Sequence, residues 1–314
     1  MLARRIVVES AASEISVDRD SGRPAGRTPD TIIVEEPLEI QLNGEAVAST
    51  MRTPGHDFEL AVGFLWAEGV LADREIVAIR YCANTGMVAH DNDTKPEWSP
   101  TSDSSTPRAA QQPTAPYWDN TYNVVNVETT GGDADVRPRL STVTSACGAC
   151  GHDAINTLTE RLRGLGPYHP WPHNLVVAMP DLMRTGQELY GATGAVHGAA
   201  VVDRNGNLVM VREDIGRHNA ADKVVGRLLL DGRLPARTPR PRADNSDPRT
   251  DDLALVTSGR ASFEMVQKAW AGGFTALVAP SGVSNLAVAT ARRASLTLMG
   301  FSRHGSGVIY SPLV

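Results

Sequence analysis

The chain is poor in cysteine, in aromatic residues and in long apolar runs. It has three cysteines among 314 residues, and aromatic side chains make up 5% of the sequence. So few cysteines, two of them in one C-x-x-C motif, do not form the disulfide framework of a small secreted protein. The N-terminal residues lack the apolar core of a signal peptide, and no apolar run reaches the roughly 18 residues of a membrane span. We therefore expect a cytoplasmic protein that does not enter a membrane.

Positive charge is not in excess either. The formal net charge is −6 at pH 7, whereas nucleic-acid binding usually needs a basic face. This balance argues against general nucleic-acid binding, and it means that an anionic ligand must be met by local Arg, Lys and backbone N–H groups. The length and the hydrophobic content of 41% suit a globular protein of about two domains.

Three segments contain little that can form a core. Residues 10–30 are polar and rich in Gly, Pro and Arg, residues 84–121 are filled with Pro, Ser, Thr, Asp and Gln, and residues 233–251 are rich in Pro and Arg. Such compositions bury little apolar surface. The sequence therefore predicts a loose leader at 1–30, a small β-rich domain at 31–140 with a disordered insert at 84–121, and an α/β domain at 141–314 with a loose insert at 233–251.

The small domain is predicted to have the element order ββαββ. Alternating apolar residues on either side of Asn43-Gly44 predict a β-hairpin. Asp57 is the expected N-cap of the helix that follows. Two further strands are expected at 76–82 and 122–128. This order resembles a β-grasp.

The second domain alternates between strand and helix patterns. We expect a strand at 175–178, a helix opened by Pro180, a hairpin around 203–207 and a helix at 218–230. Beyond these, strands are expected at 253–257, 276–279 and 296–301, and helices at 263–270 and 285–293. Such alternation implies parallel strands with helices on both faces, a three-layer α/β sandwich. The fold class is therefore α/β in this domain and α+β overall.

The C-x-x-C motif is Cys147-Gly-Ala-Cys150, followed by Gly151. Small residues leave the sulfurs little covered, and apolar residues at helical spacing begin at Ile155. The pair is therefore expected at a helix N-terminus, where the helix dipole lowers the pKa of a thiol. This setting favours a nucleophilic thiolate.

Three other interpretations of the motif stay open at this point. A structural zinc site would need Cys147, Cys150, His152 and the distant Cys82, because a second ligand pair is missing. A dithiol–disulfide switch of the thioredoxin type is chemically available. The two cysteines could also be inert and buried.

Three loops of the second domain have the chemistry of an anion site. The loops 258–260 and 281–284 join a strand to a helix and contain Ser and Gly, and 301–306 follows the last long strand. In a parallel sheet, ligands gather beyond the carboxyl ends of the strands, where helix N-termini bind phosphate. Arg303 could clamp a pyrophosphate, and Phe301 or His304 could stack on a purine. The alternative is three ordinary connections capped by Ser and Gly.

The run 212–223 is the densest polar stretch of the chain, with charges of both signs just before a helix. One interpretation is a solvated helix face. The other is an acid–base or ligand-positioning role, which His218 and Asn219 at the helix start would favour.

Together, these motifs resemble the formate dehydrogenase accessory sulfurtransferase family, FdhD. The resemblance covers about residues 31–314 without the two inserts. It rests on Thr53-Pro54 with Asp57, on Cys147-Gly-Ala-Cys-Gly151, on His197-Gly-Ala, on Arg212-Glu-Asp-Ile-Gly-Arg-His-Asn219 with Asp222-Lys223, on Ser258-Gly-Arg260, and on Thr297-Leu-Met-Gly-Phe301 with Arg303.

The resemblance implies a C-terminal domain of the cytidine-deaminase-like fold and a cytoplasmic homodimer. It implies a protein that takes sulfur from a cysteine desulfurase and passes it to the molybdenum bis(molybdopterin guanine dinucleotide) cofactor, bound as a substrate, before that cofactor enters formate dehydrogenase. By the same resemblance, Cys147 would carry the persulfide and Cys150 would support it. The implied cofactor-binding segment is Phe301, Ser302, Arg303, His304, Gly305 and Ser306.

The deaminase activity of that fold is not expected here. Zinc deaminases combine H-x-E with P-C-x-x-C, whereas Cys147 follows Ala146, and His197 is followed by Gly-Ala. We therefore expect no permanently bound metal. A thiol–disulfide oxidoreductase and a chaperone that only binds the cofactor stay as the alternative functions.

Overall fold

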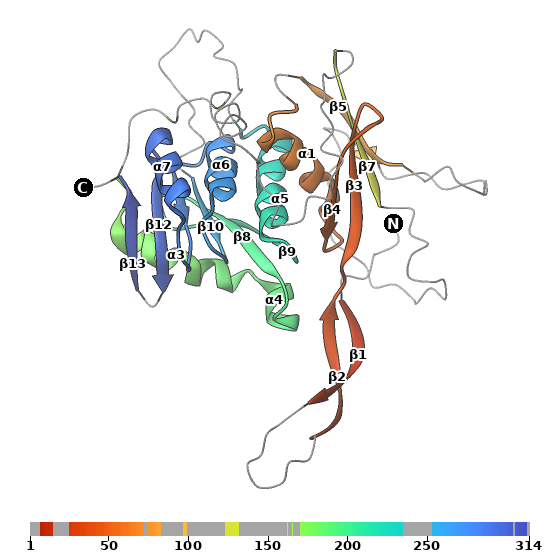
Figure 1. Ribbon diagram of the computed structural model, residues 1–314, viewed down its shortest axis with the longest axis horizontal. Coiled ribbons are helices and arrows are strands. Elements are labelled where there is room, and N and C mark those ends of the chain that lie inside the picture. Colours follow the sequence, from red (N-terminus) through yellow and green to blue (C-terminus); the bar gives the residue numbers. More distant parts are fainter. Residues whose placement is uncertain are drawn as a thin grey trace, which may run out of the picture.

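The computed structural model describes residues 7–14, 25–71, 74–82, 97–98, 123–131, 162, 165, 170–234, 253–303 and 305–312. They form two sheets of five and six strands and a separate two-stranded sheet, arranged as Figure 1 shows. The predicted C-x-x-C loop, the helix expected after it, His304 and most of both predicted inserts lie outside the described residues.

The N-terminal domain is built on the predicted hairpin. Strands β3 (Glu36–Leu42) and β4 (Glu45–Arg52) pair antiparallel, and Asn43 and Gly44 between them both have positive φ, 51° and 87°. Two consecutive residues with positive φ match the twist of the strands that they join. The prediction of a hairpin at Asn43-Gly44 is confirmed.

Three more strands complete this sheet, in the order β4-β3-β7-β5-β6. Strand β7 (Val124–Thr129) runs parallel to β3 and antiparallel to β5 (Ile76–Tyr81), and β6 (Glu97–Trp98) pairs with β5 at the edge. The strands predicted at 76–82 and 122–128 are therefore present. On β3, buried and less buried residues alternate, so one face of the sheet packs on the core.

Helix α1 (Asp57–Ala67) begins differently from the prediction. Its N-cap is His56, in the left-handed conformation, and Asp57 is the first helical residue. The carboxylate of Asp57 instead accepts two hydrogen bonds from the buried guanidinium of Arg52, at 3.0 Å from Nε and 2.9 Å from Nη2. A buried guanidinium needs a carboxylate partner. Because the Asp57 carboxylate is that partner, it does not cap the helix.

The first two strands were not expected. Strands β1 (Val7–Glu14) and β2 (Ala25–Ile33) pair antiparallel along their length and extend away from both domains (Figure 1). The sequence predicts a loose leader over residues 1–30. Backbone hydrogen bonds pair the two strands, and their residues show no strict alternation of apolar and polar side chains that would predict them.

The C-terminal domain has a six-stranded sheet in the order β13-β12-β11-β10-β8-β9. Strands β10, β11 and β12 are parallel, as predicted. Strand β8 is antiparallel to both of its neighbours, so β9 runs in the same direction as β10, and β13 returns antiparallel to β12. The bounds are β8 His197–Val202, β9 Leu208–Asp214, β10 Ala254–Thr257, β11 Ala276–Val278, β12 Thr297–Arg303 and β13 Ser306–Ser311.

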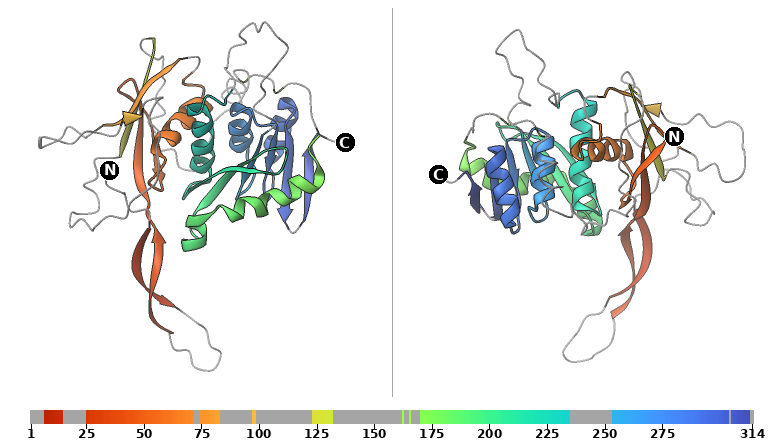
Figure 2. Two further views of the ribbon diagram at one scale, coloured as in Figure 1. Left: turned by 180° about the vertical axis from the view of Figure 1, so that it is seen from behind. Right: turned by 45° about the horizontal axis from the view of Figure 1, so that its top comes forward.

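Helices cover both faces of this sheet (Figures 1 and 2). Helices α5 (Arg217–Leu230), α6 (Phe263–Ala271) and α7 (Asn285–Ala294) lie on one face and α3 (His173–Thr185) on the other. Successive residues of β10 point to opposite faces of the sheet. Leu255 packs into the apolar cluster that includes α5, α6 and α7, whereas Ala254 and Val256 pack into the cluster that includes α3. The predicted sandwich of helices on a sheet is confirmed.

Helix α3 corrects one prediction. We expected a strand at 175–178 and a helix starting at Pro180, but a single helix contains both, with Pro180 inside it. Val176, Met179 and Met183 are buried on one side of this helix, at helical spacing. A run of four apolar residues cannot by itself distinguish a strand from part of a buried helix. A short helix, α4 (Glu188–Thr193), follows.

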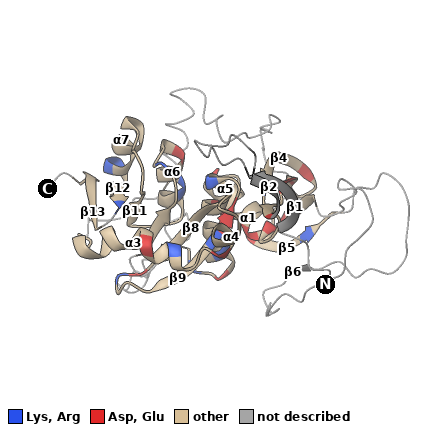
Figure 3. Ribbon diagram, turned by 90° about the horizontal axis from the view of Figure 1, so that it is seen from below, with Lys and Arg blue, Asp and Glu red and all other residues tan. Residues whose placement is uncertain are grey.

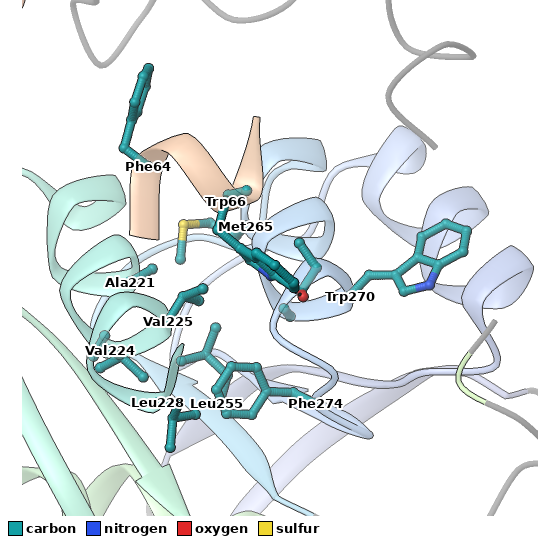
Figure 4. Close-up of a cluster of buried hydrophobic side chains, with 14 of the residues drawn as sticks. Phe64, Trp66, Ala221, Val224, Val225, Leu228, Leu255, Met265, Trp270 and Phe274 are labelled. Atoms are coloured by element: carbon teal, nitrogen blue, oxygen red, sulfur yellow. Dashed lines mark hydrogen bonds between the residues drawn. The ribbon is translucent and has the colours of Figure 1, made fainter. Parts of the chain in front are cut away.

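The two domains share one apolar core. Helix α1 crosses α5 at two glycines: a Cβ on Gly63 would lie 1.9 Å from the carbonyl oxygen of Asp222, and one on Gly226 would lie 1.8 Å from that of Glu59. This close approach puts apolar side chains of α1 in the same cluster as those of α5 and α6. Figure 4 shows Trp66 of α1 among Val225, Met265 and other side chains of the second domain.

Candidate functional site

The candidate site is the edge of the six-stranded sheet at which β9, β10, β11 and β12 end and β8 begins. The β12–β13 hairpin marks this edge at the lower end of the sheet in Figure 1. Helices α5, α6 and α7 each start just after one of these strands. The edge therefore gathers three helix N-termini, the positive ends of helix dipoles.

Backbone hydrogen bonds tie the three predicted loops together. The N–H of Ala261 donates to the carbonyl of Gly282 at 3.1 Å, and the N–H of Ser284 donates to the carbonyl of Ala261 at 3.1 Å. The N–H of Phe301 donates to the carbonyl of Ser281 at 3.0 Å. The expectation that these loops meet at one edge of the sheet is confirmed.

Phe301 is the most unusual residue of this edge. It has a positive φ of 51° and its side chain is 50% exposed. A Cβ on Gly282 would lie 3.5 Å from the tip of the Phe301 ring, so the ring extends over that loop. A left-handed bulky residue costs energy, and such strain is concentrated at functional sites. An exposed, fixed aromatic face is suited to stacking on a planar ligand.

The rest of the predicted cofactor segment divides into inward and outward groups. Ser302 is fully buried, and the hydroxyl of Ser306 donates to the carbonyl of Arg303 at 3.0 Å. Gly305 has a φ of 72° in the turn between β12 and β13. Nε of Arg303 donates to the carbonyl of Pro280 at 2.6 Å, which fixes an exposed guanidinium beside the 281–284 loop. Both serine hydroxyls are thus directed to the protein, as far as the described residues show.

His197, the first residue of β8, also lies at this edge. Its Nδ1 is 2.9 Å from Oγ of Ser258, which in addition accepts the N–H of Gly198 at 3.0 Å. Burial lowers the pKa of His197, and the nearby positive charge of Arg217 lowers it further. The imidazole is therefore neutral at pH 7 and held by the loop that precedes α6. The sequence singled out this histidine only through the family resemblance.

The run 212–223 is not a solvated face, because Arg212, Asp214 and Lys223 bind residues of the N-terminal domain. Nε and Nη2 of Arg212 donate to the two carboxylate oxygens of Glu59 in α1, at 2.5 and 3.0 Å. Nζ of Lys223, buried, is 2.7 Å from Oδ2 of Asp214 and donates to the carbonyl of Thr53 at 3.0 Å. These side chains hold the N-terminal domain against α5.

Glu213 and Asn219 of this run also have partners within the protein. The carboxylate of Glu213 accepts the N–H groups of Leu189 and Tyr190 at the start of α4, both at 2.8 Å. The side-chain amide of Asn219 donates to the carbonyl of Met51 at 2.7 Å and to Asp214 at 2.9 Å. The ligand-positioning role that the sequence suggested for Asn219 is therefore replaced by a structural one.

The first two residues of α5 are the exceptions. Nε2 of His218 lies 2.9 Å from a carboxylate oxygen of Glu264 in α6. Burial lowers the pKa of His218 although the Glu264 carboxylate opposes the change. Arg217 lies over Gly259, since a Cβ on that glycine would be 3.3 Å from Cδ of Arg217. These side chains belong to the edge, not to the domain interface.

A buried ion pair lies between α5 and α6. Nζ of Lys268 is 2.7 Å from Oδ1 of Asp222, and both side chains are buried. Burial raises the pKa of Asp222 to about 6 in spite of the lysine. Burial would lower the pKa of Lys268, but the Asp222 carboxylate outweighs it and the pKa is raised, so the ammonium is charged at neutral pH.

The cysteines of the predicted sulfur chemistry, and most ligands of the alternative zinc site, lie outside the part of the chain that the structure describes. Cys147, Cys150 and His152 lie outside the described residues, and Cys82 is a free, half-buried cysteine just after β5. No group of three or more His, Cys, Asp or Glu side chains within the described ranges is placed to hold a metal ion. None of the helices described is long and apolar enough to cross a membrane.

Comparisons with a family model and with known proteins point to the same family. The model of the FdhD/NarQ family matches residues 33–313. The sulfur carrier protein FdhD of Corynebacterium efficiens is 40% identical over 286 residues, which covers 88% of this chain and 87% of that protein. The protein of the same name from Streptomyces avermitilis is 41% identical over 292 residues, covering 90% and 88%.

A solved structure has a similar fold. It is the crystal structure of a protein from Desulfotalea psychrophila that is assigned as a formate dehydrogenase accessory protein. The two structures superpose with a TM-score of 0.62, and the match covers 98% of each chain at 22% sequence identity. At this level of identity the likeness concerns the fold.

Proposed function

Because this chain belongs to the FdhD/NarQ family, we propose that it is a sulfur carrier that acts in the cytoplasm as a homodimer. It accepts sulfane sulfur from a cysteine desulfurase as a persulfide on Cys147. It then passes this sulfur to the molybdenum of bis(molybdopterin guanine dinucleotide), its bound substrate, before formate dehydrogenase receives the cofactor. The names of the relatives support the sulfur-carrier role, and the sheet edge supports the binding of a nucleotide-like anion.

The first half of the reaction is a thiol–persulfide exchange. The Cys147 thiolate attacks the outer sulfur of the desulfurase persulfide, a new S–S bond forms, and the cysteine of the donor leaves as a thiolate. A lowered thiol pKa favours this step because the thiolate is the nucleophile. The residues on either side of Cys147 in the sequence, Ala146 and Gly148, have side chains too small to cover a thiol.

In the second half, the outer sulfur reaches the metal. The Cys150 thiolate attacks the inner sulfur, a Cys147–Cys150 disulfide forms, and the outer sulfur leaves as hydrosulfide, which the molybdenum accepts. The electrons balance, since two thiols are oxidised as one sulfane sulfur is reduced. A dithiol reductant then restores the two cysteines for the next cycle.

The observation that carries the cofactor half of this proposal is the grouping of three loops at one edge. An exposed aromatic ring, Phe301, and an oriented guanidinium, Arg303, lie beside loops that open onto helix N-termini. A guanine dinucleotide offers a planar base and a diphosphate, which are the two chemistries that such groups bind. The N–H of Phe301 and Nε of Arg303 donate to the carbonyls of Ser281 and Pro280, and these hydrogen bonds hold the segment beside the 281–284 loop.

The test is mass spectrometry of the intact chain after incubation with a cysteine desulfurase and cysteine. We expect a mass gain of about 32 Da, one sulfur atom, that maps to Cys147 and is absent in Cys147→Ser. Cys150→Ser should still load sulfur but should not release it to an acceptor. The matched control is Cys82→Ser, which should load and release as the wild type does.

Other outcomes would point to the alternative functions. A loss of about 2 Da across Cys147 and Cys150 without sulfur loading would indicate a thiol–disulfide oxidoreductase. Activation of formate dehydrogenase by the Cys147→Ser chain would indicate a chaperone that only binds the cofactor. Either result would overturn the sulfur-carrier proposal.

A further inference from the structure

The first two strands form an arm that has no third strand to support it. We call β1 (Val7–Glu14) and β2 (Ala25–Ile33) together the arm. The two strands pair with each other along their length, and within the described residues neither pairs with a strand of the larger sheets. The arm extends away from both domains in each view of Figures 1 and 2. Because a two-stranded ribbon is at best marginally stable alone in water, the arm needs a further strand.

The two outer edges of the arm differ. Strand β2 lies beside α4 and contains Pro29, which lacks the N–H of a ladder hydrogen bond and is typical of an edge strand. Strand β1 contains neither proline nor lysine, the residues that commonly protect an edge from pairing. Among the described strands, β2 alone is hydrogen-bonded to β1. The other edge of β1 is therefore able to accept a strand.

Exposed apolar side chains lie at the base of the arm. Ile32, near the end of β2, and Met51, near the end of β4, are each 42% exposed. Strand β3 starts two residues after β2, and its exposed Pro37 is paired with Met51. The neighbouring surface of the body differs, because Figure 3 shows charged residues of both signs around α1, α4 and α5. Apolar residues gathered at one place favour contact with another molecule.

We propose that β1 of two copies of this chain pair antiparallel across a twofold axis, which joins the two arms into one four-stranded sheet. This inference rests on the homodimer of the proposed function and deepens it, because it assigns the surface through which the copies meet. The strand order of the joined sheet is β2-β1-β1-β2, with the proline-containing strands at its outer edges.

A second copy fits this edge for a geometric reason. A twofold axis perpendicular to a strand makes that strand and its symmetry mate antiparallel, so an edge that is free in one copy finds a matching edge in the other. Eight residues of β1 span about 26 Å. Over this length the outward N–H and C=O groups of each β1 become partners of the other.

Antiparallel pairing also accounts for the base of the arm. It places the distal end of each arm beside the base of the other, where Ile32 and Met51 are exposed. Four strands exceed the number that a sheet needs for independent stability. The arm is thus ordered by the same contact that joins the two copies.

The first measurement is hydrogen–deuterium exchange of the full-length wild type, above and below the dissociation constant of the dimer that sedimentation equilibrium gives. We expect the amides of residues 7–14 to exchange at least about tenfold more slowly in the dimer, because ladder hydrogen bonds protect them. Strands β10 and β11, in the interior of the six-stranded sheet, should exchange at the same rate at both concentrations.

The second measurement uses a chain with Ser10→Pro and Ala11→Pro. Successive N–H groups of a strand point to opposite edges, so two consecutive prolines remove one donor from each edge of β1. The dissociation constant of the dimer should rise at least about tenfold, the effect of losing one or two backbone hydrogen bonds. The matched control has Ser104→Pro and Ser105→Pro in the proline-rich segment 84–121 and should dimerise as the wild type does. Circular dichroism and an unchanged urea midpoint establish that the two domains are folded.

The inference is overturned if the wild type is monomeric at every concentration, or if Ser10→Pro with Ala11→Pro dimerises as tightly as the control. It is also overturned if residues 7–14 are protected only after a cysteine desulfurase is added, since the arm would then serve a different partner.

The sulfur-carrier proposal is tested separately, by persulfide loading of Cys147 on the same samples. Loading by a chain whose dimer is insensitive to the prolines in β1 would refute the joined arms and leave the sulfur carrier. A dimer that depends on β1 but does not load sulfur would do the reverse.

Discussion

The contact between α1 and α5 allows a sharp prediction for Gly226→Ala. A Cβ at this position would lie 1.8 Å from the carbonyl oxygen of Glu59, and that oxygen belongs to the backbone of a buried helix. An ordinary contact begins at about 3.4 Å, so one helix must move away from the other by about 1.6 Å. Helix propensity acts in the opposite direction, because alanine in a helix interior is favoured over glycine by about 1 kcal/mol.

The size of the effect follows from what the movement disrupts. Side chains packed where α1 meets the second domain, such as Trp66 and Val225, lose a quarter to a half of their dispersion energy for each gap of about 0.5–1 Å. Overpacking of a core typically costs about 1–3 kcal/mol, and here the interface hydrogen bonds of Arg212 and Asn219 stretch as well. We expect a net destabilisation of about 3 kcal/mol.

Urea denaturation followed by circular dichroism measures this change. The midpoint should fall by about 1 M, from a slope of about 3 kcal/mol/M for a chain of this size. The matched control is Gly191→Ala, a helical glycine in α4 whose Cβ would meet nothing within 4 Å. The control should be neutral or slightly stabilising. A Gly226→Ala midpoint equal to or above that of the wild type would refute the close packing of α1 on α5.

Two predictions concern buried charges. Burial would raise the pKa of Glu59, but hydrogen bonds from His56 and Arg212 outweigh it and hold the pKa at about 2, below its usual 4.5. Its contribution is therefore present above pH 4.5 and lost as the pH falls toward 2. Glu59→Gln should lower the free energy of unfolding by about 3 kcal/mol at pH 7 and should weaken the dependence of this free energy on pH between 4.5 and 2. An unchanged pH dependence would contradict this assignment. Asp222→Asn, which leaves the Lys268 ammonium buried without its carboxylate, should cost about 3–5 kcal/mol, and adding Lys268→Met should recover part of it in urea denaturation. If the double variant is no more stable than Asp222→Asn, the pair is not coupled.

Patterns that are local in the sequence predicted most of the fold. The turn Asn43-Gly44 predicted its hairpin because two residues with positive φ select that geometry. The alternation from 253 to 301 predicted parallel strands with helices, because short apolar runs were bounded by turn and cap residues. Helix α3 was missed because Pro180 resembles a helix start. Its place inside the helix depends on the packing of Val176 and Met183 against the sheet.

The sequence predicted the meeting of the three loops at the candidate site, but not the contacts of the run 212–223. The meeting of the three loops follows from the direction of parallel strands, which the sequence pattern contains. The role of the run 212–223 does not follow from any sequence pattern, because its partners are distant in the chain. Glu59 is 153 residues from Arg212, and Thr53 is 170 residues from Lys223. No spacing rule connects such residues, so the interface was visible only in three dimensions.

The shared apolar core has a consequence for how this protein can be divided. Each domain on its own would present to water the side chains that the contact between α1 and α5 now covers, among them Trp66. Large exposed apolar patches promote aggregation. A fragment that carries only the six-stranded sheet with the candidate site would therefore be a poor reagent, and natural recombination that separated the two sheets would yield halves prone to precipitate.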